Sequence, residues 1–142
     1  MTQRTVEELS ADDCLALLKS RSVGRMVFVD DDGPGVVPVN YGVAGDEIVL
    51  RVEEDSSLRR LIQNRIGFEV DQIDSELSEG WSVLVRGGGR EVPLEDVADL
   101  LNLMHEDLPR PWAEGVHNHW LAIKIASVTG RRLRGAMHAA VY

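Results

Sequence analysis

Three short apolar segments follow one another closely between residues 25 and 52. They are RMVFV (25–29), VVPVNY (36–41) and IVLRV (48–52). The intervening DDDGPG and AGDE are rich in the aspartate, glycine and proline residues that favour turns. Parallel strands need crossover connections of about a dozen residues or more, so these segments predict an antiparallel meander.

Helical and extended patterns alternate through the rest of the chain. Ser10 is suited to cap a helix that carries Leu15 and Leu18 on one side and ends before Gly24. Further elements are predicted as helices at 53–64 and 93–104, strands at 66–73, 81–87 and 119–128, and a bulge or sharp bend at glycines 87–89. The periodicity of residues 133–142 is too weak to assign an element. About six strands, mostly joined as hairpins, with three helices predict a mainly β fold, either a barrel or a sandwich.

Composition narrows the functional classes. At 142 residues the chain is expected to form one domain, and its net charge of −9 argues against nucleic acid as a partner. GRRLR (130–134) is the candidate for a local basic patch that could bind nucleic acid, and we interpret it as a solvated chain end. No apolar run is long enough to predict a membrane span or a signal peptide. The single cysteine, Cys14, is expected to be a small buried hydrophobe, and the lack of an internal disulfide fits the cytoplasm.

Motifs that would identify a common enzyme class are absent from the sequence. It contains no phosphate-binding G-x-x-x-x-G-K-[ST] loop and no G-x-S-x-G nucleophile turn. RGGGR (86–90) follows a strand without opening a helix, so it does not fit a dinucleotide-binding loop. HNH (117–119) has no obvious third ligand, so its histidines are expected to be solvated and no metal site is predicted. No catalytic residue is assigned.

One predicted strand carries an unusual combination of residues. VVPVNYGV (36–43) is apolar, yet Pro38 lies in its middle and Asn40 and Tyr41 follow. Proline removes a donor from the ladder of a sheet and is confined to edges, strand starts or bulges. Two interpretations stay open from these residues alone. Either the strand lines a ligand site, or Pro38 marks a sheet edge and Asn40 begins a turn.

Several segments follow one another in a characteristic order within residues 10–133. They are VGRMVFVDDDGPGVVPVNYGVAGDEIVLRV, GFEVDQID, GWSVLVRG, PRPW, HWLAIKI and TGRR. Their order resembles the pyridoxamine 5′-phosphate oxidase-like family, most of all its small actinobacterial flavin-binding and nitroimidazole-resistance-type members. The resemblance implies a mainly β fold, namely a six-stranded antiparallel split β-barrel of the FMN-binding type. It also implies a homodimer, with FMN held in a cleft between the two subunits.

The same resemblance implies which strands would hold the cofactor. The strand matching residues 38–41 would pass along the isoalloxazine ring, where Asn40 would hydrogen-bond its polar edge and Tyr41 would pack nearby. The strand of residues 81–83 would lie against the other side of the cofactor. The implied cofactor-binding residues are Pro38, Val39, Asn40, Tyr41, Arg51, Ser56, Ser57, Trp81, Ser82 and Val83.

The segment expected to bind the phosphate departs from the family pattern. Flavin-binding relatives read T-x-x-G-S-K where this chain reads VEEDSSL (52–58), so Ser56 matches the serine and Ser57 replaces the lysine. Negative charge is added by Glu53, Glu54 and Asp55. Like charges about 4 Å apart repel by about 4 kcal/mol at an effective dielectric near 20. Compensation is expected from an arginine, for which the candidates are Arg51, Arg59 and Arg86.

Three functions are compatible with this pattern. The first is an FMN-dependent oxidoreductase, in which FMN carries the electron chemistry and the protein orients it. The alternative is a binding protein on the same scaffold that has lost FMN affinity and holds a deazaflavin, a tetrapyrrole or no cofactor. The third is a non-enzymatic dimer that acts through protein contacts. Oxidation of pyridoxamine phosphate itself is disfavoured, because that substrate brings a second phosphate into acidic surroundings.

Overall fold

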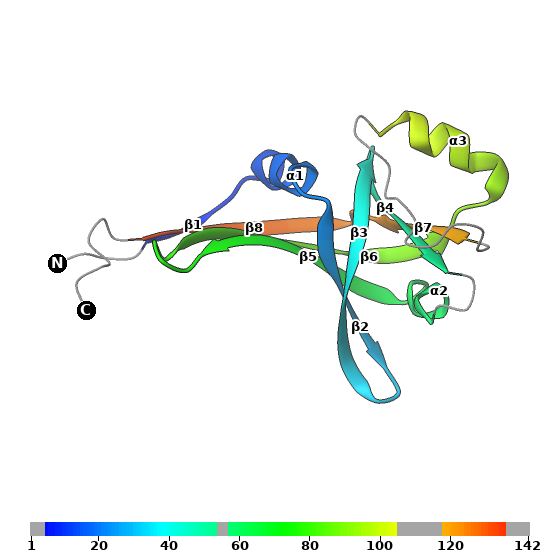
Figure 1. Cartoon of the computed structure of the whole chain (residues 1–142), viewed down its shortest axis with the longest axis horizontal. Coiled ribbons are helices and arrows are strands. Elements are labelled where there is room, and N and C mark those ends of the chain that lie inside the picture. Colours follow the sequence, from blue (N-terminus) through cyan, green and yellow to red (C-terminus); the bar gives the residue numbers. More distant parts are fainter. Residues whose placement is uncertain (1–4, 54–56, 105–117, 136–142) are drawn as a thin grey trace.

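The computed structural model describes residues 5–53, 57–104 and 118–135 of the chain. These residues form β1 (Thr5–Glu8), α1 (Ala11–Lys19), β2 (Val23–Asp30), β3 (Gly33–Ala44), β4 (Glu47–Glu53), α2 (Leu58–Leu61), β5 (Arg65–Asp74), β6 (Glu79–Glu91), α3 (Leu94–Asn102), β7 (Asn118–Lys124) and β8 (Ser127–Arg134). The strand pairs described below are all antiparallel. In Figure 1, β5, β6 and β8 form a long ribbon toward one side of the molecule, and α3 lies at the other side.

Six of the strands close into a ring. β2 pairs with β3, β3 with β4, β4 with β7, β7 with β6, β6 with β5, and β5 with β2. Closure of this kind gives each of the six strands a partner on both sides over part of its length. The predicted six-stranded antiparallel barrel is therefore confirmed, and the predicted meander corresponds to β2, β3 and β4.

The predicted number of strands is too low, because β8 and β1 extend one edge of β6 beyond the barrel. GRRLR (130–134), interpreted above as a solvated chain end, belongs to β8. In the β1–β8 pair, Glu7 lies opposite Arg132 and Glu8 opposite Arg131. Opposite charges that face each other across two strands stabilise the pairing without an apolar alternation. The hydrophobic pattern therefore does not reveal these two strands.

β6 changes its partner along its length. Its first part pairs with β8, and its last part pairs with β7. At the change, a Cβ atom on Gly87 would lie 1.8 Å from the carbonyl oxygen of Lys124. A Cβ atom on Gly89 would lie 2.1 Å from Cγ1 of Ile62. Neighbouring elements approach these two glycines too closely for any side chain, which explains the glycine run at which the sequence predicts a bend.

Two of the three helices begin near the predicted residues, and one is shorter than predicted. Ser10 caps α1 by accepting a hydrogen bond from the backbone N–H of Asp13 at 3.1 Å, and α3 begins at the expected segment. α2 has only four residues, against a prediction of 53–64. The carbonyl oxygen of Ile62 accepts a hydrogen bond from the N–H of Gly89 at 2.7 Å. That bond to β6 replaces the one that a continuing helix would need.

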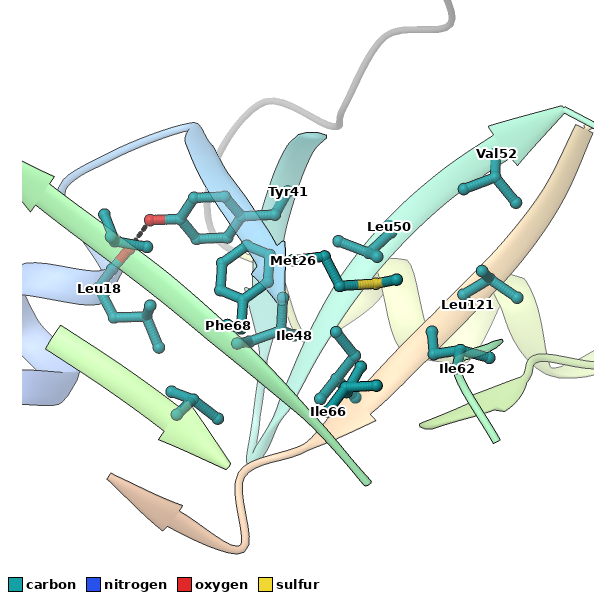
Figure 2. Close-up of a cluster of buried hydrophobic side chains, with 13 residues drawn as sticks. Leu18, Met26, Tyr41, Ile48, Leu50, Val52, Ile62, Ile66, Phe68 and Leu121 are labelled. Carbon is teal, nitrogen blue, oxygen red and sulfur yellow. Dashed lines mark hydrogen bonds between the residues drawn. The ribbon is translucent and has the colours of Figure 1, made fainter. Parts of the chain in front are cut away.

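Two apolar clusters hold these elements together. The larger cluster fills the barrel and contains Leu18, Met26, Tyr41, Ile48, Leu50, Val52, Ile62, Ile66, Phe68, Val70, Val85, Leu121 and Ile123 (Figure 2). The smaller cluster joins α3 to the outside of β4 and β7, and contains Ala44, Val49, Val92, Leu100, Trp120 and Ala122. Within the described ranges, none of the helices has the length and apolar character needed to cross a membrane.

Candidate functional site

Strand alternation places two neighbouring residues of β3 on opposite faces of the sheet. Tyr41 points into the barrel and is only 3 % exposed. Its hydroxyl donates a hydrogen bond to the backbone carbonyl of Leu18, and its ring meets Phe68 edge-on, with centroids 5.0 Å apart (Figure 2). Because successive side chains of a strand point to opposite faces, Asn40 lies on the outside of the barrel. Of the two, Asn40 is therefore placed to meet a ligand, whereas the Tyr41 side chain belongs to the core.

Pro38 lies where its missing N–H leaves no gap in the ladder. The N–H of Tyr41 donates to the carbonyl of Ser22 at 3.0 Å, and Pro38 lies opposite Arg25 in the β2–β3 register. Hydrogen-bonded positions alternate in an antiparallel pair, so the nitrogen of Pro38 points away from β2. On that side, β4 pairs only with the stretch from Tyr41 to Ala44. Within the described ranges Pro38 therefore marks a sheet edge, as one of the two interpretations predicts.

The outward-pointing residues of several strands form one surface, which we call the outer face. It comprises Val6, Val23, Arg25, Val27, Val29, Val36, Pro38, Asn40, Glu69, Asp71, Ile73, Ser82, Leu84 and Arg131. Asn40 lies opposite Val23, and Ser82 lies opposite Asp71. Neighbouring strands are about 4.8 Å apart, so Asn40 and Ser82, which are three strands apart, are separated by about 14 Å within one chain.

An arginine and two carboxylates lie in the middle of the outer face. Nη1 of Arg25 is 2.9 Å from Oε1 of Glu69 and 2.8 Å from Oδ2 of Asp71. Partial burial raises the pKa of Glu69, and the neighbouring Asp71 raises it further, in spite of the opposing effect of Arg25. Glu69 therefore takes up a proton at a higher pH than an isolated glutamate does.

Arg51 lies on the outside of the barrel beside the outer face. Leu50 opposes Tyr41 and points into the core, so Arg51, the next residue of β4, points outward as Asn40 does. The guanidinium carbon of Arg51 lies 5.2 Å from the centre of the Trp120 ring, within the range of a cation–π contact. Nε of Arg51 is buried and has no hydrogen-bond partner in the described part of the chain. A buried, unpaired donor of this kind fits an anionic ligand.

The predicted phosphate segment is described only in part. Ser56 lies outside the described residues, as do Glu54 and Asp55. Ser57 precedes α2 and is exposed, and its side chain makes no capping hydrogen bond. A helix of a single turn has few unpaired N–H groups held in line, so α2 by itself is not an anion site.

Arg59 and His119 contact one carboxylate at the end of the barrel. Nη2 of Arg59 lies 3.2 and 3.3 Å from the two carboxylate oxygens of Glu91, and Nδ1 of His119 contacts one of them. Burial raises the pKa of Glu91, but the hydrogen bonds from His119 and Arg59 outweigh this effect and lower it. Among the three candidate arginines, Arg59 is thus paired with a carboxylate, whereas Arg86 is exposed on β6.

Three further predicted site residues, in addition to Tyr41, point away from the outer face. Val83 is fully buried, and Val39 packs against the barrel core. Trp81 lies two residues before Val83 and therefore on the same side of β6. It lines a pocket of about 210 Å³ at the far ends of β5, β6 and β8. The side chains of these three residues do not share a surface with Asn40 and Ser82.

Comparison with known proteins identifies the family of this chain. The sequence profile of the pyridoxamine 5′-phosphate oxidase family matches residues 10–132, which is most of the chain. The chain belongs to the pyridoxamine 5′-phosphate oxidase family. An uncharacterized protein from Mycobacterium tuberculosis is 31 % identical over 137 residues, and the alignment covers 92 % of this chain and 87 % of that protein.

Solved structures agree with this assignment. The FAD binding protein from Mycobacterium smegmatis is 32 % identical with a TM-score of 0.70, and the alignment covers 92 % of this chain and 100 % of that one. A FAD-binding protein from Mesorhizobium loti has the same fold at 24 % identity, with a TM-score of 0.73 and coverage of 92 % and 98 %. The six-stranded ring of this chain is thus the split barrel of the pyridoxamine 5′-phosphate oxidase family.

Sequence reasoning missed the charged group in the middle of the outer face of this family member. The alternation in FEVD indicates that Glu69 and Asp71 share one side of a strand. Arg25 is 44 residues away from Glu69 along the chain. Only the register of β2 on β5 brings Arg25 beside the two carboxylates, and no local pattern carries that information.

Proposed function

We propose that this protein is a flavin-dependent oxidoreductase that holds the polar edge of an isoalloxazine ring at Asn40. The amide of Asn40 offers both a donor and an acceptor, and it lies outside the barrel next to the strand edge at Pro38. The observation that carries the proposal is the 32 % identity to the FAD binding protein from Mycobacterium smegmatis across that whole chain. The flavin would supply the electron-transfer chemistry, so the protein needs to bind, orient and shield it.

We further propose that two copies of the chain pack through their outer faces and hold the flavin between them. The large hydrophobic side chains on this face that are exposed are Val6, Val23, Val29, Val36 and Ile73. A group of exposed apolar residues on one surface is typical of an interaction site. Asn40 and Ser82 are about 14 Å apart within one chain, so the Ser82 that reaches the same ring would come from the second copy.

We propose that Arg51 binds the phosphate end of the flavin. It would take the place of the lysine in the family's T-x-x-G-S-K segment, where this chain has Ser57. Arg51 points outward on the strand next to Asn40, and its buried Nε has no partner in the described ranges. A guanidinium can donate two parallel hydrogen bonds to a phosphate. Ser56 and Ser57 stay predictions, as does FMN rather than FAD as the bound nucleotide.

Titration of flavin-free protein with FMN and, separately, with FAD tests the proposal. Difference absorbance in the visible range should saturate with a Kd in the micromolar range or tighter. Arg51→Ala should weaken binding at least about tenfold, because it removes charge-assisted hydrogen bonds, and Asn40→Ala should weaken it severalfold. If neither flavin binds saturably to the folded protein, the proposal is wrong. If saturable binding is observed, the nucleotide with the lower Kd is the one that the protein prefers.

A second candidate is a binding protein on the same scaffold without flavin affinity. It is favoured by the acidic residues of VEEDSSL (52–58), which disfavour a phosphate. Thermal shift with a deazaflavin and with haem tests this candidate, because a ligand specific for the folded state raises the melting temperature. A shift with either of these and none with FMN or FAD would select it over the oxidoreductase.

We also propose that the protein works in the cytoplasm. Cys14, the single cysteine of the sequence, is a free, buried thiol in α1. Burial raises the pKa of Cys14, and the neighbouring Asp13 raises it further. A buried thiol with a raised pKa is unreactive, and a protein without a disulfide does not depend on an oxidising compartment to fold.

A further inference from the structure

The pocket at Trp81 lies on the opposite side of the sheet from the proposed flavin. Its volume is about 210 Å³, and its lining residues are Gln72, Asp74, Glu79, Gly80, Trp81, Arg132, Leu133 and Arg134. Trp81 lies opposite Gln72 in one register and opposite Arg132 in the other, so the three residues form a row across β5, β6 and β8. Trp81 and Ser82 point to opposite faces, and this pocket is therefore separate from the outer face.

Arg132 brings an unused donor to the pocket. Nε of Arg132 is buried and makes no hydrogen bond to any described residue. Glu7 lies opposite Arg132 in the β1–β8 register, but its carboxylate is 3.4 Å from Nε of Arg134 instead. A guanidinium with a free nitrogen is suited to a carboxylate, which accepts hydrogen bonds from two of its nitrogens at once.

Two carboxylates line the same pocket one step further along the strands. Asp74 lies opposite Glu79 in the β5–β6 register, and like charges in that position destabilise a strand pair. Oδ1 of Asp74 is held by the backbone N–H groups of Glu76 and Leu77, at 3.1 and 3.2 Å. A cationic group between the two carboxylates would offset their repulsion. It would lie about 7 Å from the row of Trp81, since two residues of a strand span that distance.

We infer that this pocket binds a small zwitterion with an apolar side chain, of the α-amino acid type. The ligand carboxylate meets Arg132, and its ammonium group lies toward Asp74 and Glu79. The apolar part packs on the indole of Trp81. A simple anion would be repelled by the two carboxylates and a simple cation by the two arginines, so a ligand with both charges matches the pocket best.

Calorimetric titration of the whole protein with L-phenylalanine tests this inference. We expect saturable binding with a Kd of about 1 mM or tighter. Two analogues separate the charges, since 3-phenylpropanoate lacks the ammonium group and phenethylamine lacks the carboxylate. Each should bind at least about tenfold more weakly, because each loses a charge-assisted contact. No saturation of L-phenylalanine up to roughly 10 mM, or equal binding of either analogue, would overturn the inference.

Arg131 and Arg132 form a matched pair, because they are adjacent in β8 and point to opposite faces. Arg132→Ala should weaken L-phenylalanine binding at least about tenfold, whereas Arg131→Ala should change it by less than about twofold. Arg132→Lys keeps the positive charge but loses the two parallel donors of the guanidinium, so its affinity for L-phenylalanine should fall between that of the native protein and that of Arg132→Ala. This variant allows the test even if the alanine variant does not fold. Equal losses at the two positions would contradict the assignment.

Discussion

Replacement of Tyr41 by phenylalanine removes one buried hydroxyl and leaves the ring in place. That hydroxyl donates to the backbone carbonyl of Leu18, which belongs to the last turn of α1, where carbonyls have no partner within the helix. Loss of a buried hydrogen bond that leaves its partner unsatisfied costs about 1–3 kcal/mol. The edge-on contact with Phe68 remains, so no cavity is added to this cost. We expect the free energy of unfolding of Tyr41→Phe to fall by about 1.5 kcal/mol.

Urea denaturation followed by circular dichroism measures this loss, with an unchanged dependence on urea concentration. For a chain of this length the melting temperature should fall by about 6 °C. Flavin affinity should not change, because the hydroxyl points into the core. Asn40→Ala, one residue earlier and on the outside, should do the reverse and keep stability within about 0.5 kcal/mol of the native protein. Native stability in Tyr41→Phe, or loss of flavin by the folded variant, would refute this assignment of the two faces.

Three further predictions address the barrel, the charged group and the dimer. Gly87→Ala should cost more than about 2 kcal/mol in urea denaturation, because its Cβ would lie 1.8 Å from the Lys124 carbonyl oxygen; native-like stability would contradict the described crossing. The pKa of Glu69 is higher in the folded state than its usual value of 4.5, so protonation of Glu69 stabilises the fold. This contribution to the free energy of unfolding is present below pH 4.5 and is lost as the pH rises through the folded-state pKa. Glu69→Gln should therefore gain stability relative to the native protein as the pH rises through the folded-state pKa of Glu69, and a relative loss would be inconsistent with that sign. Val36→Glu should give a monomer in analytical ultracentrifugation, whereas Leu94→Glu on α3 should stay dimeric; a native monomer would end the dimer proposal.

Local patterns determine the elements of this barrel. The meander follows from three apolar segments with connections too short for a parallel crossover. Ser10 marks the start of α1, and the glycines around Gly87 mark the point where β6 changes its partner, because both signals depend on a few adjacent residues. Alternation within one strand likewise determines that Asn40 and Tyr41 point to opposite sides.

Only the tertiary structure decides which of those sides is buried and what lies across from each residue. Tyr41 is in the core because β3 closes a ring with strands distant in sequence, which leaves Asn40 outside. Arg25 joins Glu69 through a register between segments 44 residues apart, and Trp81 joins Arg132 through the pairing of β6 with β8. Contacts of this kind depend on long-range strand pairing, which a local pattern of residues does not encode.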